Sequence, residues 1–183
     1  MISTEKDIIA QCQQGDTAAF RHVVERYQTM LFTLGLKMLG DEEEAKDIVQ
    51  DTFLKAWERI RQYDSRYAFS TWLYTIASRL CMSRMKRMRR LAPLPEDEQV
   101  LRRYINEMDG QRQLENSELA AIVRVLVDGL GAKQRTVFTL CHLEGLDNHE
   151  LEERTGLDAR QVKSNLYAAR QIIRERLKRL GYE

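Results

Sequence analysis

The sequence predicts an all-α protein made of two small helical domains joined by a flexible linker. Apolar residues recur at steps of three and four along most of the chain, and no segment alternates between apolar and polar residues as a half-buried strand would. The only two prolines, Pro93 and Pro95, open a polar and acidic stretch between the two periodic halves. We therefore predict a first domain over residues 1–92, a linker over 93–116 and a second domain over 117–183.

Four helices are predicted in the first domain from its periodicity and its capping residues. Asp16 or Thr17 caps the second helix by accepting a backbone N–H that the first helical turn leaves free. Asp41 caps the third helix, whose first turn carries three glutamates at the end where the helix dipole favours negative charge. Ser70 is the predicted cap of the fourth. The expected bounds are about 3–14, 17–39, 42–61 and 69–90.

The third helix has an acidic outward face. Its predicted buried residues are Ala45, Ile48, Val49, Phe53, Ala56 and Ile60. The opposite face carries Asp47, Gln50, Asp51, Leu54 and Glu58. A leucine among carboxylates and an amide suits a protein partner, and the negative charge would repel DNA. A solvated acidic face is the alternative interpretation.

The fourth helix combines a packed face with a cationic end. At about 100° per residue, one side carries Phe69, Leu73, Ile76, Ala77 and Leu80. The other side, with Trp72 and Arg79 on its flank, carries Thr71, Tyr74, Thr75, Ser78, Met82, Lys86 and Arg89. From Ser78 to Arg90 the chain has six Lys or Arg and no Asp or Glu. The pattern favours a helix laid against nucleic acid, although an amphipathic helix with a solvated basic end would look the same.

The second domain is predicted to end in a helix-turn-helix. Four helices are expected in it. The first runs from about 118 to Gly129, the second ends at Gly145, and the last two span about 148–155 and 159–180. Gly156 lies in the short turn between the last two, at helix-turn-helix spacing. The outward face of the last helix, unless it is merely solvated, could bind DNA, because Arg and Gln read base edges and Lys and Ser suit phosphates. That face carries Arg160, Ser164, Tyr167 and Gln171, with Lys163, Arg170 and Arg174 beside them.

Three blocks of this sequence, taken together, resemble bacterial sigma factors of the extracytoplasmic-function group of the sigma-70 family. EAKDIVQDTFLKAW (44–57) is similar to the family segment that docks on the polymerase clamp. FSTWLYTIASRL (69–80) is similar to the helix that melts the promoter and reads the minus-ten element. NHELEERTGLDARQVKSNLYAAR (148–170), preceded by RTVFTLCHLEG, resembles the helix-turn-helix that reads the minus-thirty-five element. Their order, with a linker between the second and third, makes the resemblance specific.

The resemblance implies a sigma region 2-like four-helix domain and a sigma region 4-like helix-turn-helix domain. It implies a sigma factor that binds the clamp and flap regions of core RNA polymerase and directs it to promoter DNA. The implied core-binding residues are Glu44, Asp47, Gln50, Asp51, Leu54, Trp57 and Glu58. The implied minus-ten and melting residues, assisted by the loop 63–69, are Phe69, Trp72, Tyr74, Arg79, Ser83, Arg84, Lys86 and Arg87. The implied minus-thirty-five residues are Arg160, Gln161, Lys163, Ser164, Tyr167, Arg170 and Arg174.

The sequence departs from the family pattern at three places. Arg79 and Ser83 stand where members usually have Asn and Asp on the minus-ten helix. Leu130-Gly131 replaces a frequent Leu-Pro, which should affect only a helix start. Residues 158–161, DARQ, replace a common Gly-Thr entry into the recognition helix. The resemblance therefore does not give the promoter sequence, and the upstream preference is expected to be atypical.

Other function classes fit less well. No phosphate-binding glycine loop, CxxC or HExxH occurs, and the three histidines lie on different segments, so we expect neither an enzyme nor a cofactor or metal. The three cysteines are unpatterned, no apolar run approaches the roughly 18 residues of a membrane span, and no secretory signal is visible, so we expect a cytoplasmic protein without direct membrane contact. Anti-sigma proteins are common partners in the group. A helix-turn-helix regulator that is not a polymerase subunit is the remaining alternative, but it leaves blocks 44–57 and 69–80 unexplained.

Overall fold

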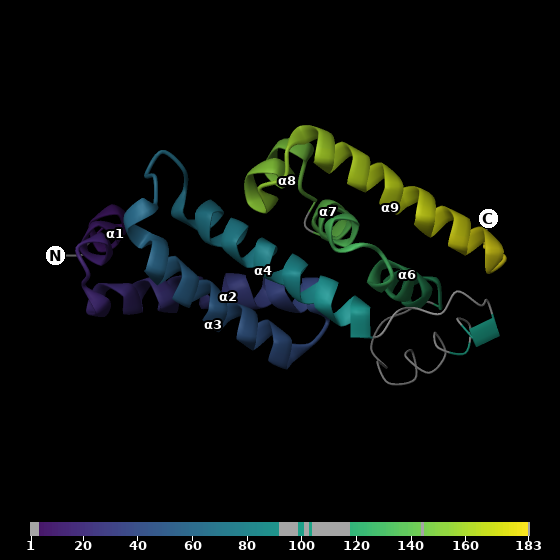
Figure 1. Cartoon of the computed structure of the whole chain (residues 1–183), viewed down its shortest axis with the longest axis horizontal. Helices are drawn as coiled ribbons and strands as arrows, with labels where there is room; N and C mark the ends of the chain where they lie inside the picture. Colours follow the sequence, from purple (N-terminus) through teal and green to yellow (C-terminus); the bar gives the residue numbers. More distant parts are fainter. Residues whose placement is uncertain (1–3, 92–98, 101–102, 104–117, 144, 183) are drawn as a thin grey trace. The chain divides into compact units, whose positions relative to one another are not determined.

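The structure is a computed structural model that describes residues 4–91, 99–100, 103, 118–143 and 145–182 (Figure 1). Over these residues it has helices and no strand, which confirms the all-α prediction. The chain forms two compact units. One is Met1–Cys81 with Glu153–Gly156, and the other is Met82–Glu152 with Leu157–Glu183. Most of the predicted linker, 93–116, lies outside the described residues, and the domain bounds taken from the sequence stay predictions.

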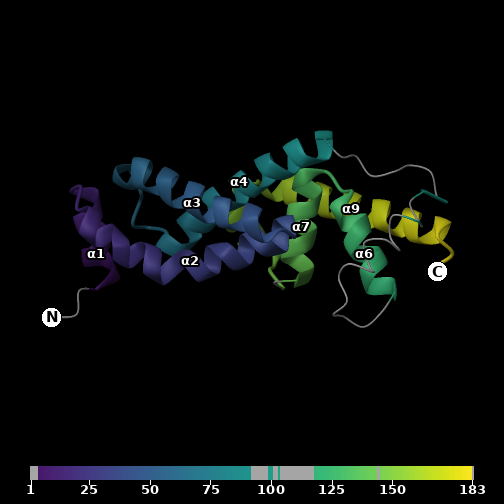
Figure 2. The same ribbon diagram turned by 90° about the horizontal axis from the view of Figure 1, so that it is seen from below.

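The helices of the first unit begin where short polar side chains cap them. Thr4 and Asp7 form a reciprocal capping box, Asp16 accepts from the N–H of residues 18 and 19, and Asp41 accepts from the N–H of Glu44. Figures 1 and 2 show the second and third helices lying side by side. The elements are α1 (Glu5–Gln13), α2 (Thr17–Leu39), α3 (Glu42–Arg59), the 3-10 turn η1 (Ile60–Gln62) and α4 (Phe69–Leu91), whose last residues belong to the second unit.

The cap of α4 differs from the prediction. The helix begins at Phe69, and the Trp72 N–H already donates to the carbonyl oxygen of Ala68 at 3.1 Å. Ser70 therefore lies inside the first turn and is not the cap, so this prediction was wrong. A cap at Ser70 would make residue 71 the first helical one, whereas the backbone is already helical at Phe69, two residues earlier, where the Phe69 side chain packs into the core at 2% exposure.

The core of the first unit is closely packed between α2 and α3. A Cβ atom at Gly35 would lie only 3.0 Å from the Cα of Ala45, so these two helices approach with almost no side chain between them. Val49, predicted to be buried, is only half-buried. Thr52, which was not predicted to be buried, is fully buried. Thr52 tolerates burial because its hydroxyl donates to the carbonyl oxygen of Ile48 at 2.6 Å.

The second unit packs its last helix against two shorter ones. Its elements, besides the end of α4, are α6 (Glu118–Asp128), α7 (Ala132–Leu143), α8 (Asn148–Thr155, as far as Glu152) and α9 (Ala159–Arg179). Their apolar cluster comprises Ile122, Val125, Leu126, Leu130, Ala169, Ile173 and Leu180. An ion pair of 2.7 Å joins Arg135 Nη2 of α7 to Asp128 Oδ1 at the end of α6. Gly131 stands where the family often has proline, directly before α7. Here Gln134 Oε1 accepts from the Gly131 N–H at 3.0 Å, so the start of α7 is stabilised by a side chain of its own first turn.

Candidate functional site

The outward face of α3 carries the predicted acidic surface. Asp47, Gln50 and Glu58 are exposed, and the leucine among them, Leu54, is 56% exposed. The remaining predicted core-binding residues are less open: Glu44, Asp51 and Trp57 are half-buried. The Trp57 ring meets the Phe20 ring edge-on, with centroids 5.0 Å apart, so it helps to hold α3 on α2. An apolar side chain left in water between acidic ones is an arrangement that a protein partner can cover.

An aromatic cluster forms at the start of α4. The Phe69 ring lies against Tyr63, Tyr27 and Trp72, with centroids 5.0, 5.8 and 5.4 Å away. Because Phe69 is buried, its side chain supports the surface and cannot contact DNA directly, which corrects its place among the predicted DNA-binding residues. Trp72 is half-buried, and the exposed ring nearby in the sequence is Tyr67, which is 59% exposed and which sequence reasoning did not single out.

The predicted outward position of Tyr74 and Ser78 is wrong. Both are buried, at 5% and 0% exposure. The Tyr74 ring has the Arg154 guanidinium 5.1 Å from its centroid, within the same compact unit. A helical periodicity cannot foresee this cover, because Arg154 comes from a segment far away in the sequence. In this structure, therefore, Tyr74 does not present its ring for stacking.

The basic end of α4 is open to solvent. Arg79, Ser83, Lys86 and Arg87 are exposed, and Arg84 is half-buried. Between Ser78 and Leu91 the helix has no acidic residue that could neutralise these cations. The arrangement suits contact with a chain of phosphates, whose charge contributes to affinity whatever the base sequence.

The turn before α9 is set by local hydrogen bonds. Gly156 adopts φ +68°, a left-handed conformation that favours glycine. Asp158 then caps α9: its Oδ1 accepts from the Gln161 N–H at 2.8 Å, while Gln161 Oε1 accepts from the Asp158 N–H at 3.4 Å. This capping box occupies the Gln161 side chain, which the sequence had offered for base reading.

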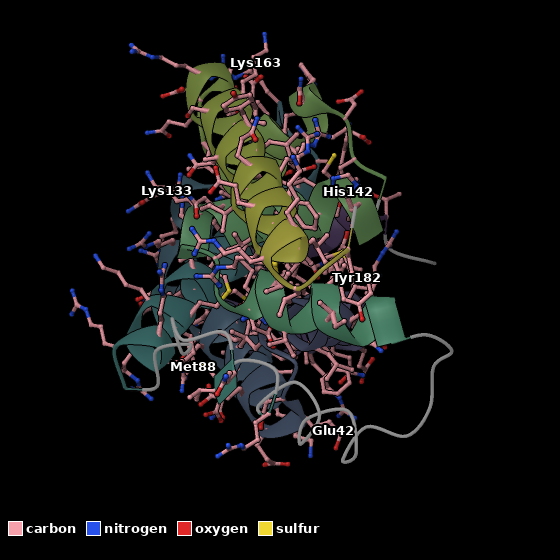
Figure 3. The ribbon with its side chains drawn as sticks, turned by 90° about the vertical axis from the view of Figure 1, so that its right-hand side faces the viewer. Glu42, Met88, Lys133, His142, Lys163 and Tyr182 are labelled. Carbon is pink, nitrogen blue, oxygen red and sulfur yellow. The ribbon has the colours of Figure 1, made fainter. Side chains whose placement is uncertain are left out.

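Beyond the cap, the start of α9 presents exposed side chains. Arg160, Lys163 and Ser164 are exposed, and the Tyr167 ring, one turn farther on, is 67% exposed. Figure 3 shows Lys163 near one end of α9 and Tyr182 beyond the other. This first part of the helix can therefore enter a groove without moving the apolar cluster beneath it.

The far part of α9 borders a groove that the sequence did not predict. It has a volume of about 730 Å³ and an apolar floor with a cationic rim. Its lining includes Phe138, His142, Arg170, Ile173, Arg174 and Leu177. Arg170 and Arg174, expected to grip DNA backbone, thus also edge this groove. The His142 side chain is exposed overall, but partial burial of its ring and, secondly, the Arg170 charge lower the pKa of His142.

The His142 imidazole should consequently titrate below its usual value of 6.5, and Arg170→Gln should raise its pKa without fully restoring it, because burial is the larger cause. Folding favours the neutral ring, so its contribution to stability is present above about pH 6.5 and declines as the pH falls toward the lowered pKa. An NMR titration of the ring measures both variants. Arg174→Gln is the matched control from the same groove, and an unshifted pKa in the native chain would contradict the assignment.

The described residues contain neither a metal-binding cluster nor a membrane-spanning helix. No group of three or more His, Cys, Asp or Glu side chains in the described ranges could hold a metal ion. Among the helices as described, none combines the length and apolarity that crossing a membrane requires.

Comparison with known proteins places two family models on the chain. Sigma-70 region 2 matches residues 23–91, and Sigma-70 region 4 matches residues 120–173. The ECF RNA polymerase sigma factor SigW of Bacillus subtilis is 30% identical over 96% of this chain and 97% of its own length. The ECF RNA polymerase sigma-E factor of Haemophilus influenzae is 29% identical over 97% of each chain.

Two solved structures share the fold. CnrH, in complex with the cytosolic domain of CnrY, has a TM-score of 0.58 and 24% identity, over 93% of this chain and 95% of that one. The sigma factor RpoE of Bartonella quintana, in complex with the anti-sigma factor NepR, has a TM-score of 0.55 and 21% identity, over 87% and 96%. At these identities the likeness concerns the fold.

Proposed function

We propose that separate helical faces of this chain bind core RNA polymerase and the two promoter elements. The chain belongs to the extracytoplasmic-function group of the sigma-70 family. The chain is a sigma factor: it binds core polymerase, directs promoter-specific transcription initiation and is not an enzyme. Its site of action is the cytoplasm, where polymerase and DNA meet.

The acidic face of α3 would bind the polymerase clamp. The exposed Leu54 between Gln50 and Glu58 carries this assignment, since an apolar contact ringed by polar groups is the usual composition of a protein interface. The sign of the charge separates this face from DNA, which it would repel. Glu44 and Trp57 would support the face from its half-buried edges.

The start and end of α4 would share the minus-ten element. Trp72 and the loop before the helix would separate strands and hold an unstacked base, because an aromatic ring offers a stacking surface to every base. Arg79, Arg84, Lys86 and Arg87 would hold backbone phosphates, with Ser83 beside them. The buried Phe69 and Tyr74 have supporting positions.

The start of α9 would enter the major groove of the minus-thirty-five element. Arg160 is the best-placed base reader, because it is exposed next to the cap while Gln161 is engaged within it. Lys163 and Ser164 suit phosphates, and Tyr167 suits an apolar contact. Arg170 and Arg174 lie farther along the helix, on the rim of the protein groove described above. Their candidate partners are the polymerase flap and the DNA backbone.

An anti-sigma protein is a further proposed partner. The sigma factor RpoE was solved in complex with the anti-sigma factor NepR, and CnrH was solved in complex with the cytosolic domain of CnrY; this chain shares the fold of both. The faces proposed for polymerase and DNA are the ones such a protein would have to cover.

Run-off transcription with purified core polymerase on genomic DNA tests the proposed function as a whole. Adding the chain should produce discrete transcripts from specific promoters, and core polymerase alone should not. Sequence-specific DNA binding by the chain without polymerase, and no promoter-specific transcript with it, would instead indicate a regulator.

Arg160→Ala should weaken recognition at one base position of the upstream element. A good bidentate contact discriminates by about 1–3 kcal/mol, so transcription should fall by about tenfold on the preferred base and much less on the other three. Transcription from a set of templates that vary each upstream position measures this. Lys163→Ala is the control: as a phosphate contact it should lower all templates alike, and the same uniform loss for Arg160→Ala would reassign that residue to the backbone.

A further inference from the structure

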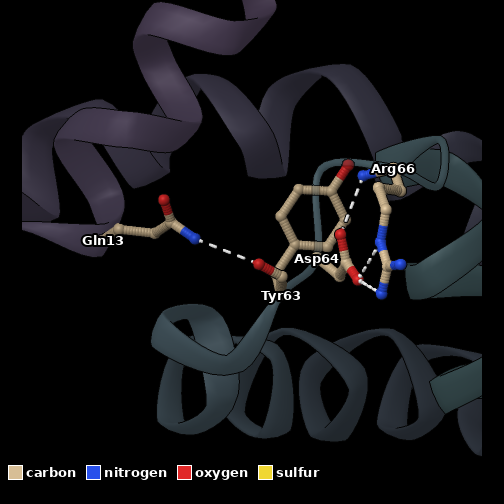
Figure 4. Close-up of polar contacts among 4 residues, drawn as sticks. All are labelled: Gln13, Tyr63, Asp64 and Arg66. Atoms are coloured by element: carbon tan, nitrogen blue, oxygen red, sulfur yellow. Dashed lines mark hydrogen bonds and ion pairs between the residues drawn. The ribbon is translucent and has the colours of Figure 1, made fainter.

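The first helix, α1, holds the segment that leads into α4. The Gln13 side-chain amide donates from Nε2 to the carbonyl oxygen of Ile60 at 3.1 Å and to that of Tyr63 at 3.3 Å. Figure 4 shows the contact with Tyr63. Both partners are acceptors, so only the NH₂ group of the amide can face them. Ile60 is the first residue of η1 and Tyr63 directly follows its last. The Ile60 carbonyl oxygen also accepts from the Tyr63 N–H at 3.2 Å, so the Gln13 amide braces a turn that is already closed by its own backbone.

The other end of α1 is also anchored to the first unit. The Tyr27 hydroxyl donates to the Glu5 carboxylate, and Arg26 Nε lies 3.6 Å from the same oxygen. With Gln13 at one end and Glu5 at the other, α1 links α2 to η1. All of α1 precedes residues 23–91, which the region 2 family model matches, so the family match assigns it no role.

Tyr63, one of the two residues that Gln13 contacts, is the first residue of the loop over residues 63–68. The Tyr63 ring packs against Phe69 and Trp72, with centroids 5.0 and 5.3 Å away. Its hydroxyl donates to the carbonyl oxygen of Tyr67 at 2.5 Å, and the Tyr67 N–H donates to the carbonyl oxygen of Asp64 at 3.2 Å. The position of Tyr63 therefore fixes the position of Tyr67.

The turn inside the loop is closed by one charged pair. Asp64 accepts from the Arg66 backbone N–H at 3.0 Å and from its Nε at 2.7 Å (Figure 4). The same Arg66 contacts lower the pKa of the Asp64 carboxyl, which keeps the pair charged. These bonds hold the backbone of the loop on both sides of the residue from which the Tyr67 ring, 59% exposed, projects.

We propose that Gln13 is a positioning residue for promoter opening: it fixes Tyr63 so that the Tyr67 ring is set in advance to stack on an unpaired base of the opened minus-ten strand. The inference rests on the proposed strand-opening role of this loop and α4. A loop that is already ordered loses less conformational entropy when it binds, so removing the Gln13 donor should weaken base capture without removing any DNA contact.

The test uses holoenzyme, reconstituted from core polymerase and the full chain, on a promoter identified by run-off transcription. Fluorescence anisotropy gives its affinity for the single-stranded minus-ten non-template oligonucleotide and, separately, for a duplex upstream fragment. Gln13→Met and Gln13→Glu should each weaken single-strand binding by about threefold to tenfold and leave duplex binding unchanged. Gln14→Glu, an exposed neighbour with the same change of charge, should behave like the native chain.

The pH dependence of single-strand affinity distinguishes a positioning role of Gln13 from a general loss of folded structure in its variants. The carboxyl group introduced by Gln13→Glu can donate an O–H to a carbonyl only when it is protonated. The single-strand affinity of that variant, relative to the native chain, should therefore recover toward pH 5, and that of Gln13→Met should not. A flat ratio for both variants would overturn the inference. So would a parallel loss of core-polymerase affinity or thermal stability in Gln13→Met, which would show a purely structural role.

Tyr67→Ala distinguishes a failure of the positioning role of Gln13 from a failure of the proposed strand-opening role of the loop. It should weaken single-strand binding by about tenfold, the loss of one stacked base. If Tyr67→Ala weakens binding but the Gln13 variants do not, the positioning inference alone fails. If Tyr67→Ala and Trp72→Ala both leave binding unchanged, the proposed strand-opening role of the loop fails as well.

Discussion

Replacing Leu54 with aspartate should release core RNA polymerase from the chain. Leu54 is 56% exposed on α3, so its removal costs the fold little, whereas a carboxylate buried against the clamp would be desolvated without a partner. Residues at the centre of an interface often cost 2 kcal/mol or more when truncated, so we expect the dissociation constant for core polymerase to rise by at least about thirtyfold. Biolayer interferometry with immobilised core enzyme measures it, and run-off transcription should fall in parallel.

Leu36→Asp is the matched control for this variant. Leu36 is 37% exposed, lies on α2 of the same unit and is outside the acidic face. It should retain polymerase binding if the effect depends on the face and not on adding a carboxylate to the unit. Equal affinities for the Leu54→Asp variant and the native chain would rule out the clamp assignment. The charge reversal Asp51→Lys should act in the same direction, although Asp51 is half-buried and its substitution is less clean.

Local chemistry explains why the sequence predicts most helix bounds. Asp16 and Asp41 act as caps through bonds to N–H groups two and three residues ahead, and Gly40 and Gly156 end helices in left-handed conformations. Such contacts depend only on neighbouring residues, so a pattern is enough to find them. The helix-turn-helix is similarly local, and α8 has the predicted bounds, Asn148–Thr155.

The features that the sequence did not reveal involve residues far apart along the chain. Gln13 reaches carbonyl groups 47 and 50 residues away, and no periodicity distinguishes it from its exposed neighbour Gln14. The periodicity of α4 places Tyr74 on the outward face, but in the structure the Arg154 guanidinium lies over its ring. A helical pattern gives the faces of one element but not which element packs on them. The candidate sites were therefore predictable as faces, and less so residue by residue.

Gly35→Leu should clearly destabilise the first unit although it leaves every polar contact intact. The backbone at Gly35 lies so close to α3 that a new Cβ would meet the Ala45 Cα at 3.0 Å and its carbonyl oxygen at 3.3 Å, and the rest of a leucine has no space. Overpacking costs about 1–3 kcal/mol or more, against a gain of about 1 kcal/mol in helix propensity. Because the rest of the leucine has no space, the cost should lie at the upper end of this range, and we expect a net loss of about 2 kcal/mol, or roughly a 10 °C fall in Tm for a unit of this size.

The two tryptophans of the chain make this measurement specific to the first unit, because Trp57 and Trp72 both lie there. Thermal unfolding followed by their fluorescence should show the fall in Tm, whatever the second unit does. Gly35→Ala is the matched control, since it gains the same helix propensity with only the short Cβ contact, and its Tm should stay within a few degrees of the native value. Ala45→Gly removes the facing Cβ at 3.2 Å but costs about 1 kcal/mol in helix propensity, so the double variant should be more stable than the sum of the two single changes predicts. If Gly35→Leu unfolds at the native temperature, α2 and α3 are not packed backbone to backbone, and the acidic face of α3 loses the rigid support that presents it to polymerase.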